Sequence, residues 1–567
     1  MATMTTSTDL RTLADEYWEA KLQASPLTAS FFGDHRYDDR ADELSVEAEQ
    51  RFRRTWSQLR DRAARLDGQG LDEADRVTRD LLMYELEDAI TSIEHRFVEL
   101  APDQMQGAHA QLLMLASQLR APEPQHAQMA LTRIGELARM LDEATQRYVD
   151  GIRAGRTPAH INVTRSLHQV ESYLASPLDT DPFVTLAGPP EWDGTPRWRE
   201  QMTAAVRDLL RPAFGRYGDV FRTQLLSAAR PDDRPGLCHL REGEDLYHVL
   251  IEHHTGLPLT AAELHQIGLD EVTGALRAEF AEIGARALGT SDIQQIFARL
   301  KNDPDLRYRD GDAVLQHARR CLEGATARMS DWFGILPQAA CVLTPVPEFL
   351  AADVPGAYYT PPAPDGSRPG EYHVNLHEPT ERARFPTASI AYHEAIPGHH
   401  LQLAIATERT DLPKFRRMSW AHTAFVEGWA LYAERLADEM DLYDTPLDRL
   451  GLVASDAWRA GRLVVDTGLH AFGWTRQQAI DFLAEHMPVD LDTITVEVDR
   501  YIGMPAQALA YKVGQREIAR MRSDARRGLG DRFDVKGFHD VVLGAATISL
   551  PVLGTRVAEW VASTQPA

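Results

Sequence analysis

The chain has 567 residues, of which 44% are hydrophobic and 25% charged, a composition that is ordinary for a globular protein with a large core. Its formal net charge of -24 at pH 7 argues against a nucleic-acid partner, because phosphate binding needs a concentrated basic surface. The 3 cysteines form no Cys-x-x-Cys pair, which argues against a disulfide framework or a cysteine-rich metal site.

The N-terminus carries no recognisable targeting signal. Residues 1–22 read MATMTTSTDLRTLADEYWEAKL, with no basic stretch followed by a continuous apolar run. The longest uncharged apolar stretch, residues 541–554, is interrupted by Pro551 and is too short to span a bilayer. These features predict a protein without a membrane segment and with a cytoplasmic location.

Helical periodicity runs along the whole chain. Leu10, Ala14, Trp18 and Leu22 recur at four-residue steps, which is typical of an amphipathic helix. Similar patterns cover residues 81–90, 112–119, 132–151, 200–228, 261–284, 313–334, 387–407, 416–440, 447–471, 476–487, 495–522 and 536–547. Proline and glycine punctuate these stretches, but no long linker or internal repeat is present. The sequence therefore predicts an all-α protein with one domain over residues 1–567.

One segment departs from the helical pattern. Between residues 341 and 376, short alternating runs at 357–360 and 371–375 flank turns rich in proline, glycine and aspartate. Such runs around turn residues are typical of a β-hairpin. We expect this small hairpin directly before the helix that carries the next motif, where its edge could bind an extended peptide.

A histidine motif marks the candidate chemistry. Residues 391–404 read AYHEAIPGHHLQLA, so His393-Glu394 opens like the zinc motif His-Glu-x-x-His. In that motif two histidines one turn apart hold Zn²⁺ and the glutamate polarises a water molecule. Here the fourth position after His393 is Pro397. The next histidines are His399, six positions after His393, and His400, seven positions after it.

The residues between the histidines suggest how the motif could still work. In a straight helix His400 would return to the face of His393, but about 10 Å further along the axis. Pro397 and Gly398 are expected to kink or bulge the helix, because proline removes a hydrogen bond and glycine adopts unusual backbone angles. Such a bulge would bring His399 into the second ligand position, and His400 remains the alternative.

The third ligand is predicted downstream. Residues 419–440 form a strong helical pattern in which Glu427 lies within an apolar run. A carboxylate in such surroundings needs a partner, and a divalent cation or an arginine could supply one. Gly428 suggests a close approach by another element, since glycine in mid-helix costs about 1 kcal/mol. Glu434, seven residues after Glu427, could accept a hydrogen bond from a ligand histidine.

The segments HEAIPGHH and FVEGWALYAE make the chain resemble the bacterial family called domain of unknown function 885. The resemblance extends to residues 458–474 and 500–514 and covers nearly the whole chain. It implies a fold similar to the helical metallopeptidases of the carboxypeptidase Taq, neurolysin and angiotensin-converting enzyme group. Two mostly helical lobes would surround a deep cleft, with walls mainly from residues 240–525 and the small hairpin or sheet beside the metal-site helix.

The resemblance also suggests residues that could act on a substrate. Helical metallopeptidases commonly place a tyrosine late in the chain to stabilise an oxyanion, and Tyr501 and Tyr511 are the candidates here. Ordinary aromatic packing is the alternative for both. Arg459, Arg462 and Arg500 lie in the matching segments and could bind a substrate carboxylate, although structural ion pairs are the favoured alternative.

Together these patterns predict a metal-dependent hydrolase of peptide or amide bonds that acts on short peptides or small amides. Zn²⁺, or another divalent metal, would be held by His393, His399 (or His400) and Glu427, with Glu394 as the proton carrier. Two alternatives stay open: a metal-dependent amidohydrolase or lyase of small molecules, and a non-catalytic binding protein with a metallopeptidase shell. Neither a nucleic acid nor a membrane is an expected partner.

Overall fold

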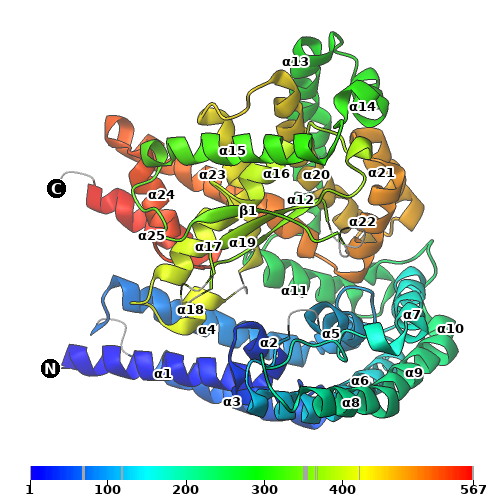
Figure 1. Ribbon diagram of the computed structural model, residues 1–567. Coiled ribbons are helices and arrows are strands. Elements are labelled where there is room, and N and C mark those ends of the chain that lie inside the picture. Colours follow the sequence, from blue (N-terminus) through cyan, green and yellow to red (C-terminus); the bar gives the residue numbers. More distant parts are fainter. Residues whose placement is uncertain are drawn as a thin grey trace.

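Helices make up most of the chain, as the apolar periodicity predicts. The structure is a computed structural model that describes residues 2–66, 70–116, 119–348, 351, 355–363, 366, 368–419 and 422–564. In Figure 1 the helices up to α10 form a lower group and most helices from α12 onward form an upper group, with α11 (Gly243–Thr255) between them; from the upper group, α18 (Lys414–Met418) reaches down to α1 (Ala2–Ala24). This arrangement in two helical groups agrees with the predicted fold class.

The lower group contains the first ten helices of the chain. Their bounds are α1 (Ala2–Ala24), α2 (Pro26–Phe31), α3 (Val46–Ala64), α4 (Glu73–Glu94), α5 (Ala108–Ala116), α6 (Pro124–Arg153), α7 (His160–Ala175), α8 (Thr195–Ala205), α9 (Arg211–Val220) and α10 (Leu226–Ala228). Short π-helical turns at Val206–Leu210 and Phe221–Leu225 join α8, α9 and α10. The chain therefore follows one helical path over the predicted range 200–228, but its backbone hydrogen bonds change from the α to the π pattern in two places.

The upper group carries the histidine motif and the segments after it. Its helices are α12 (Ala261–Asp270), α13 (Leu276–Leu288), α14 (Ile293–Asn302), α15 (Gly311–Trp332), α16 (Thr387–Glu394), α17 (His399–Glu408), α18 (Lys414–Met418), α19 (Thr423–Glu439), α20 (Pro446–His470), α21 (Arg476–His486), α22 (Leu491–Gly503), α23 (Ala510–Leu529), α24 (Val535–Leu543) and α25 (Leu550–Thr564). Three of the predicted helices, 387–407, 416–440 and 495–522, are each divided in two.

A three-stranded sheet lies beside the motif helices. The predicted hairpin is confirmed: β2 (Ala357–Thr360) pairs antiparallel with β3 (Gly370–Val374). A further strand, β1 (Cys341–Pro345), pairs parallel with the other edge of β3, so the order is β1-β3-β2. β1 was not predicted, because its pairing with β3 joins residues about thirty positions apart and leaves no local signal in the sequence.

Three apolar clusters hold the helices together. The first joins helices from both ends of the chain, so α1 and α4 share a core with α16, α19 and α25. The second lies among α5 to α9, and the third among α13, α14 and α20 to α22. Burying one large apolar side chain stabilises the fold by about 1.5–3 kcal/mol. The first cluster therefore ties the N-terminal helices firmly to the helices of the histidine motif.

Among the described residues, no helix combines the length and the apolar character needed to cross a membrane.

Candidate metal centre

The histidine motif lies where one helix ends and the next begins. α16 ends at Glu394, a turn follows, and α17 begins at His399. Gly398 permits this turn: a Cβ at this position would lie 2.0 Å from the carbonyl oxygen of His393. The helix is therefore interrupted as predicted, and only glycine allows the chain to pass so close to the end of α16.

A side chain from α19 fixes the turn in place. The indole Nε1 of Trp429 donates a hydrogen bond to the carbonyl oxygen of Pro397 at 3.0 Å. Trp429 is fully buried, so this bond is shielded from water. The turn that positions His399 is thus attached to the helix that carries Glu427.

The turn brings three ligand-type atoms together. Nε2 of His393 lies 3.5 Å from Oε2 of Glu427, and Nε2 of His399 lies 3.6 Å from the same oxygen. One ligand atom from each of the three residues lies within 4.8 Å of the other two. Of the described residues, only these three histidine, cysteine or acidic side chains form such a group.

These distances fit a metal ion better than hydrogen bonds. A contact of 3.5 Å or more is too long for a good N–H···O bond. Two N or O ligands of a tetrahedral Zn²⁺, each about 2.0–2.2 Å from the ion, lie about 3.3–3.6 Å apart. The separations from His393 and His399 to Glu427 match the edges of such a tetrahedron. The three residues could therefore hold a metal ion.

A hydrogen bond from the other ring nitrogen orients the first histidine. Nδ1 of His393 lies 2.8 Å from Oε1 of Glu434, and the second oxygen of Glu434 accepts a hydrogen bond from the Ser389 hydroxyl. An N–H on Nδ1 leaves the Nε2 lone pair free to bind a metal. The predicted role of Glu434 as acceptor is confirmed, while Ser389, four residues before His393 on the same helix face, was missed.

The charges of the group favour a cation. Burial lowers the pKa of His393, but the carboxylates of Glu427 and Glu434 outweigh it and raise this pKa to about 9. Burial raises the pKa of Glu427, but His393 and His399 outweigh it and hold this pKa well below its ordinary value. Two carboxylates thus draw positive charge to this point, and a divalent cation can replace the proton.

His400 points to the sheet. Its Nδ1 lies 2.9 Å from the Tyr359 hydroxyl, and its Nε2 lies 3.1 Å from the carbonyl oxygen of Ala339. Burial lowers the pKa of His400 to about 4, so the ring is neutral at neutral pH. His400 therefore joins α17 to the sheet, and His399 is the histidine that the structure places next to Glu427.

Glu394 carries a carboxylate that none of the described residues engages. It is the last residue of α16, directly after His393, and its side chain is half-buried. Within the described part of the chain, no hydrogen bond or ion pair engages its carboxylate. A free carboxylate beside a group that can hold a metal is able to accept and release a proton.

The helix that carries Glu427 packs unusually close to α23. A Cβ on Gly428 would lie 2.4 Å from Cα of Gly514, and a Cβ on Gly514 would lie 1.8 Å from the carbonyl oxygen of Ala424. The predicted close approach at Gly428 is confirmed. Because both positions are glycine, the backbones of α19 and α23 come into direct contact, and this contact fixes the position of Glu427.

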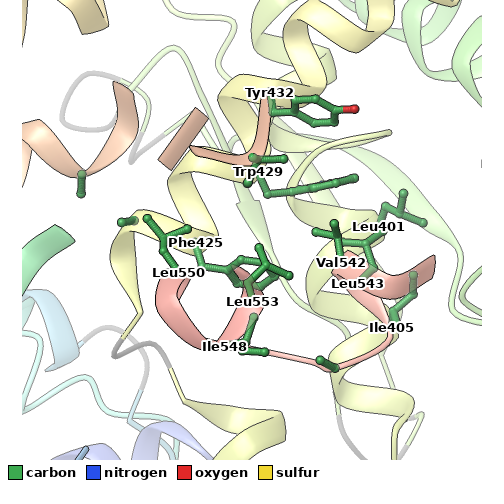
Figure 2. Packing of buried hydrophobic residues seen from close by; sticks show 14 of the residues in the cluster. Leu401, Ile405, Phe425, Trp429, Tyr432, Val542, Leu543, Ile548, Leu550 and Leu553 are labelled. Atoms are coloured by element: carbon green, nitrogen blue, oxygen red, sulfur yellow. The ribbon is translucent and has the colours of Figure 1, made fainter. Parts of the chain in front are cut away.

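An apolar layer supports the same helices from behind. Figure 2 shows Leu401 and Ile405 of α17 next to Val542 and Leu543 of α24, with Trp429 of α19 nearby. All five side chains are buried in the first cluster. Close packing of this kind leaves the metal-site helices little freedom to shift.

The two candidate tyrosines have different surroundings. The Tyr501 hydroxyl donates to Oε2 of Glu497 at 2.7 Å and accepts from Nε of Arg462 at 2.9 Å, and Tyr501 is 1% exposed. Tyr511 is half-buried, and the Arg462 guanidinium lies 4.6 Å from its ring centroid. Tyr511 lies one turn before Gly514 on α23, close to the helix of Glu427.

The candidate arginines mostly have protein partners. Arg462 pairs with Glu497 at 3.0 Å, and Arg500 pairs with the same carboxylate at 3.3 Å and with Oε1 of Gln507 at 2.8 Å. Arg459 donates to the Ser455 hydroxyl at 2.8 Å. Sequence reasoning left structural ion pairs as the favoured alternative, and it missed Glu497, the carboxylate that collects two of these arginines.

Comparisons with known proteins agree with this fold. The family model described as "Bacterial protein of unknown function (DUF885)" matches residues 26–557. A Colwellia psychrerythraea protein, described as a candidate lipoprotein, has a TM-score of 0.89 at 24% identity, covering 99% of this chain and 100% of that one. A candidate lipoprotein of unknown function from Shewanella oneidensis has a TM-score of 0.74 at 19% identity, covering 96% and 98%. A search of curated proteins finds no match. Because the family model matches most of its length, the chain belongs to the bacterial family DUF885, whose function is unknown.

Proposed function

We propose that the protein is a metal-dependent hydrolase of peptide or amide bonds, acting on short peptides or small amides. One observation carries this proposal: two histidine Nε2 atoms lie 3.5 and 3.6 Å from one carboxylate oxygen of Glu427. The residue next to the first histidine, Glu394, has its carboxylate free among the described residues. A site that only stabilised the fold would need no such carboxylate.

His393, His399 and Glu427 would hold the ion, and two nitrogens with one carboxylate are a donor set that suits Zn²⁺. When bound, the ion supplies positive charge that makes water more acidic and stabilises negative charge on the attacked oxygen. Glu394 accepts the proton of the attacking water and delivers it to the leaving amine. Glu434 keeps the His393 ring in the orientation that points Nε2 toward Glu427.

Tyr511 is the better of the two candidates for an oxyanion donor. The hydroxyl of Tyr501 already donates to Glu497, so it cannot donate to a substrate without breaking a buried bond. Within the described chain, no hydrogen bond engages the Tyr511 hydroxyl. Removal of a single oxyanion donor raises the activation free energy by about 2.7–4 kcal/mol in an enzyme where this has been tested.

The first experiment measures metal in protein purified without chelator, beside the His393→Ala variant. We expect about one zinc per chain in the wild type and none in the variant. Glu394→Gln should keep the zinc and lose hydrolysis in a screen of short peptides and small amides. Zinc in neither protein, or full hydrolysis by Glu394→Gln, would contradict the proposal. Cleavage of small amides but not of peptides would assign the site to small-molecule chemistry.

The names of the two structural relatives bear on location. Both are described as candidate lipoproteins, which supports a place at the cell envelope rather than the cytoplasm expected from the N-terminal residues. We infer envelope association on this ground. Fractionation of cells that produce the full chain tests it, and recovery of the protein only with the cytosol would reject it.

A further inference from the structure

A second site lies at the other end of the motif helix. A cavity of about 740 Å³ is enclosed by the end of α13, residues 306–309, the first half of α15, Arg384 before α16, and the start of α20. It contains none of the metal-site residues. α16 spans 8 residues, about 12 Å of helix, with the cavity residue Arg384 before its first residue and His393 and Glu394 at its end.

The cavity wall is basic although the chain as a whole is acidic. It includes five arginines and two aspartates, in a protein with a net charge of -24. The members are Arg286, Arg307, Arg309, Arg320, Arg384, Asp444 and Asp448. The wall thus gathers guanidinium groups, which are donors suited to an anionic ligand wherever a carboxylate does not already engage them.

Three of the arginines already have carboxylate partners at the rim. Arg286 pairs with Glu282 at 2.9 Å, Arg309 pairs with Asp310 at 3.1 Å, and Arg307 pairs with Glu381. At least one side chain of each pair is well exposed to water. Exposed pairs contribute little and exchange readily, so these arginines can turn to a ligand at small cost.

The other two arginines have no carboxylate partner within the described chain. The side chain of Arg320 on α15 is exposed, and its guanidinium makes no hydrogen bond to the described residues. Arg384 donates from Nη2 to the carbonyl oxygen of Asp305 at 3.0 Å, while its buried Nε has no acceptor. Both side chains line the cavity, so it offers charged donors that no protein group uses.

The two aspartates of the wall offset part of the positive charge of the arginines. Asp448 accepts hydrogen bonds from the backbone N–H and the hydroxyl of Thr445 at 3.2 and 2.7 Å, which caps the start of α20. Its other oxygen lies 3.5 Å from Nε2 of His317. Asp444 is exposed at the rim. Asp448 is thus engaged in the fold, and two unpaired arginines remain available.

The cavity is larger than an inorganic ion requires. Its volume falls within the 300–1,000 Å³ that is typical of sites for small organic molecules. Apolar groups from Leu306, Leu447 and the Tyr308 ring form part of the wall. The ligand should therefore combine a compact negative group with an uncharged body.

We propose that this cavity binds a small organic phosphate, with its phosphate group between Arg320 and Arg384. A phosphate places close to two negative charges on three oxygens, and guanidinium forks bind it bidentately. The site shares no residue with the metal group. Binding here goes beyond the proposed hydrolase function and does not depend on it.

The test is calorimetric titration at low salt of wild type, Arg320→Ala and Arg319→Ala with adenosine monophosphate, glycerol 3-phosphate and citrate. Arg319 is the matched control, since it is the exposed neighbour of Arg320 on α15 and does not line the cavity. We expect at least one phosphate to bind. Its affinity should fall tenfold or more in Arg320→Ala and less than twofold in Arg319→Ala.

Three results would overturn the proposal. No binding of either phosphate at millimolar concentration would mean that the cavity is not a phosphate site. Equal losses in both variants would mean that binding follows general surface charge rather than the cavity. Tighter binding of citrate than of either phosphate would assign the cavity to polycarboxylates. None of these results depends on metal content or hydrolysis, so the hydrolase proposal fails or stands separately.

Discussion

The substitution Glu434→Gln tests how the candidate metal site is built. Glu434 is 1% exposed, and its carboxylate binds Nδ1 of His393 at 2.8 Å and the Ser389 hydroxyl. Glutamine has nearly the same shape, and its amide oxygen can still accept from His393. The change therefore removes the negative charge while it keeps the packing.

The magnitude follows from the role of that charge. A carboxylate behind a ligand histidine makes the imidazole more basic and fixes its ring, and removing it costs about 10–100-fold in metal affinity. This loss equals about 1.4–2.7 kcal/mol. Burial raises the pKa of Glu434, but His393 and Arg459 outweigh it and keep this pKa below its ordinary value, so the charge is present at neutral pH.

The assay is competition between protein and a chromogenic zinc chelator at neutral pH. The matched control is Glu439→Gln on the same helix, whose side chain is 48% exposed and pairs with Arg522 at 2.7 Å. We expect Glu434→Gln to bind zinc at least tenfold more weakly and the control to match wild type. If folded Glu434→Gln bound zinc within twofold of wild type, our account of how His393 is oriented would be wrong.

Three further predictions concern single residues. Elemental analysis should find no zinc in His399→Ala but about one zinc per chain in His400→Ala, and the reverse pattern would exchange their roles. Gly514→Ala should lower the melting temperature markedly, because the added Cβ would lie 1.8 Å from a carbonyl oxygen of α19. Overpacking of this kind costs about 1–3 kcal/mol of stability. An unchanged melting temperature would refute the close contact. Burial raises the pKa of Asp466 to about 7, so the folded state binds this proton more tightly than the unfolded state does. The free energy of unfolding should therefore fall by up to about 4 kcal/mol as the pH rises from about 4 to about 7. Asp466→Asn should lose that part of the pH dependence of the melting temperature, and an unaltered pH profile would contradict the raised pKa.

The sequence was sufficient for most of the fold because apolar periodicity is a local property. Helices such as α15 and α20 lie within two residues of the predicted ranges, since nothing within them competes with the helical pattern. The hairpin of β2 and β3 was predicted for the same reason. β1 was missed because its partner is distant in sequence, and parallel pairing leaves no turn between the strands to recognise.

The candidate site was predicted to the level of residue types but not of geometry. The pattern indicated that Pro397 and Gly398 interrupt the helix, yet it could not decide between His399 and His400. The decision depends on how closely Gly398 approaches the carbonyl oxygen of His393. It also depends on a sheet that offers His400 the hydroxyl of Tyr359. Both are contacts between separate elements, which spacing alone does not encode.

A different kind of information was missing for the arginines. Arg462 and Arg500 stood in segments that resemble the bacterial family DUF885, so they were candidates for substrate binding. The structure places both beside Glu497. A buried arginine needs hydrogen-bond acceptors and is often paired with a carboxylate, and the sequence offers 84 acidic residues from which to choose. Which acidic residue lies beside a given arginine depends on the path of the whole chain.

The interrupted motif explains why the metal group does not need the usual spacing. In an unbroken helix both histidines lie on one element, so the second must stand at the fourth position after the first. Here each ligand has its own anchor. The Tyr392 hydroxyl donates to the carbonyl oxygen of Leu442 at 2.6 Å and holds α16 beside His393. The apolar layer holds α17, and the contact of Gly428 with Gly514 holds α19.

Because three separately anchored helices converge, packing alone sets the positions of His393, His399 and Glu427. The turn that joins α16 to α17 then has only to span a fixed gap, and its length can change while the ligand atoms stay in place. Trp429 couples this turn to the helix of Glu427 through its bond to Pro397. An extended histidine motif is therefore compatible with an ordinary tetrahedral site, and the two additional residues by themselves give no reason to expect a different metal chemistry.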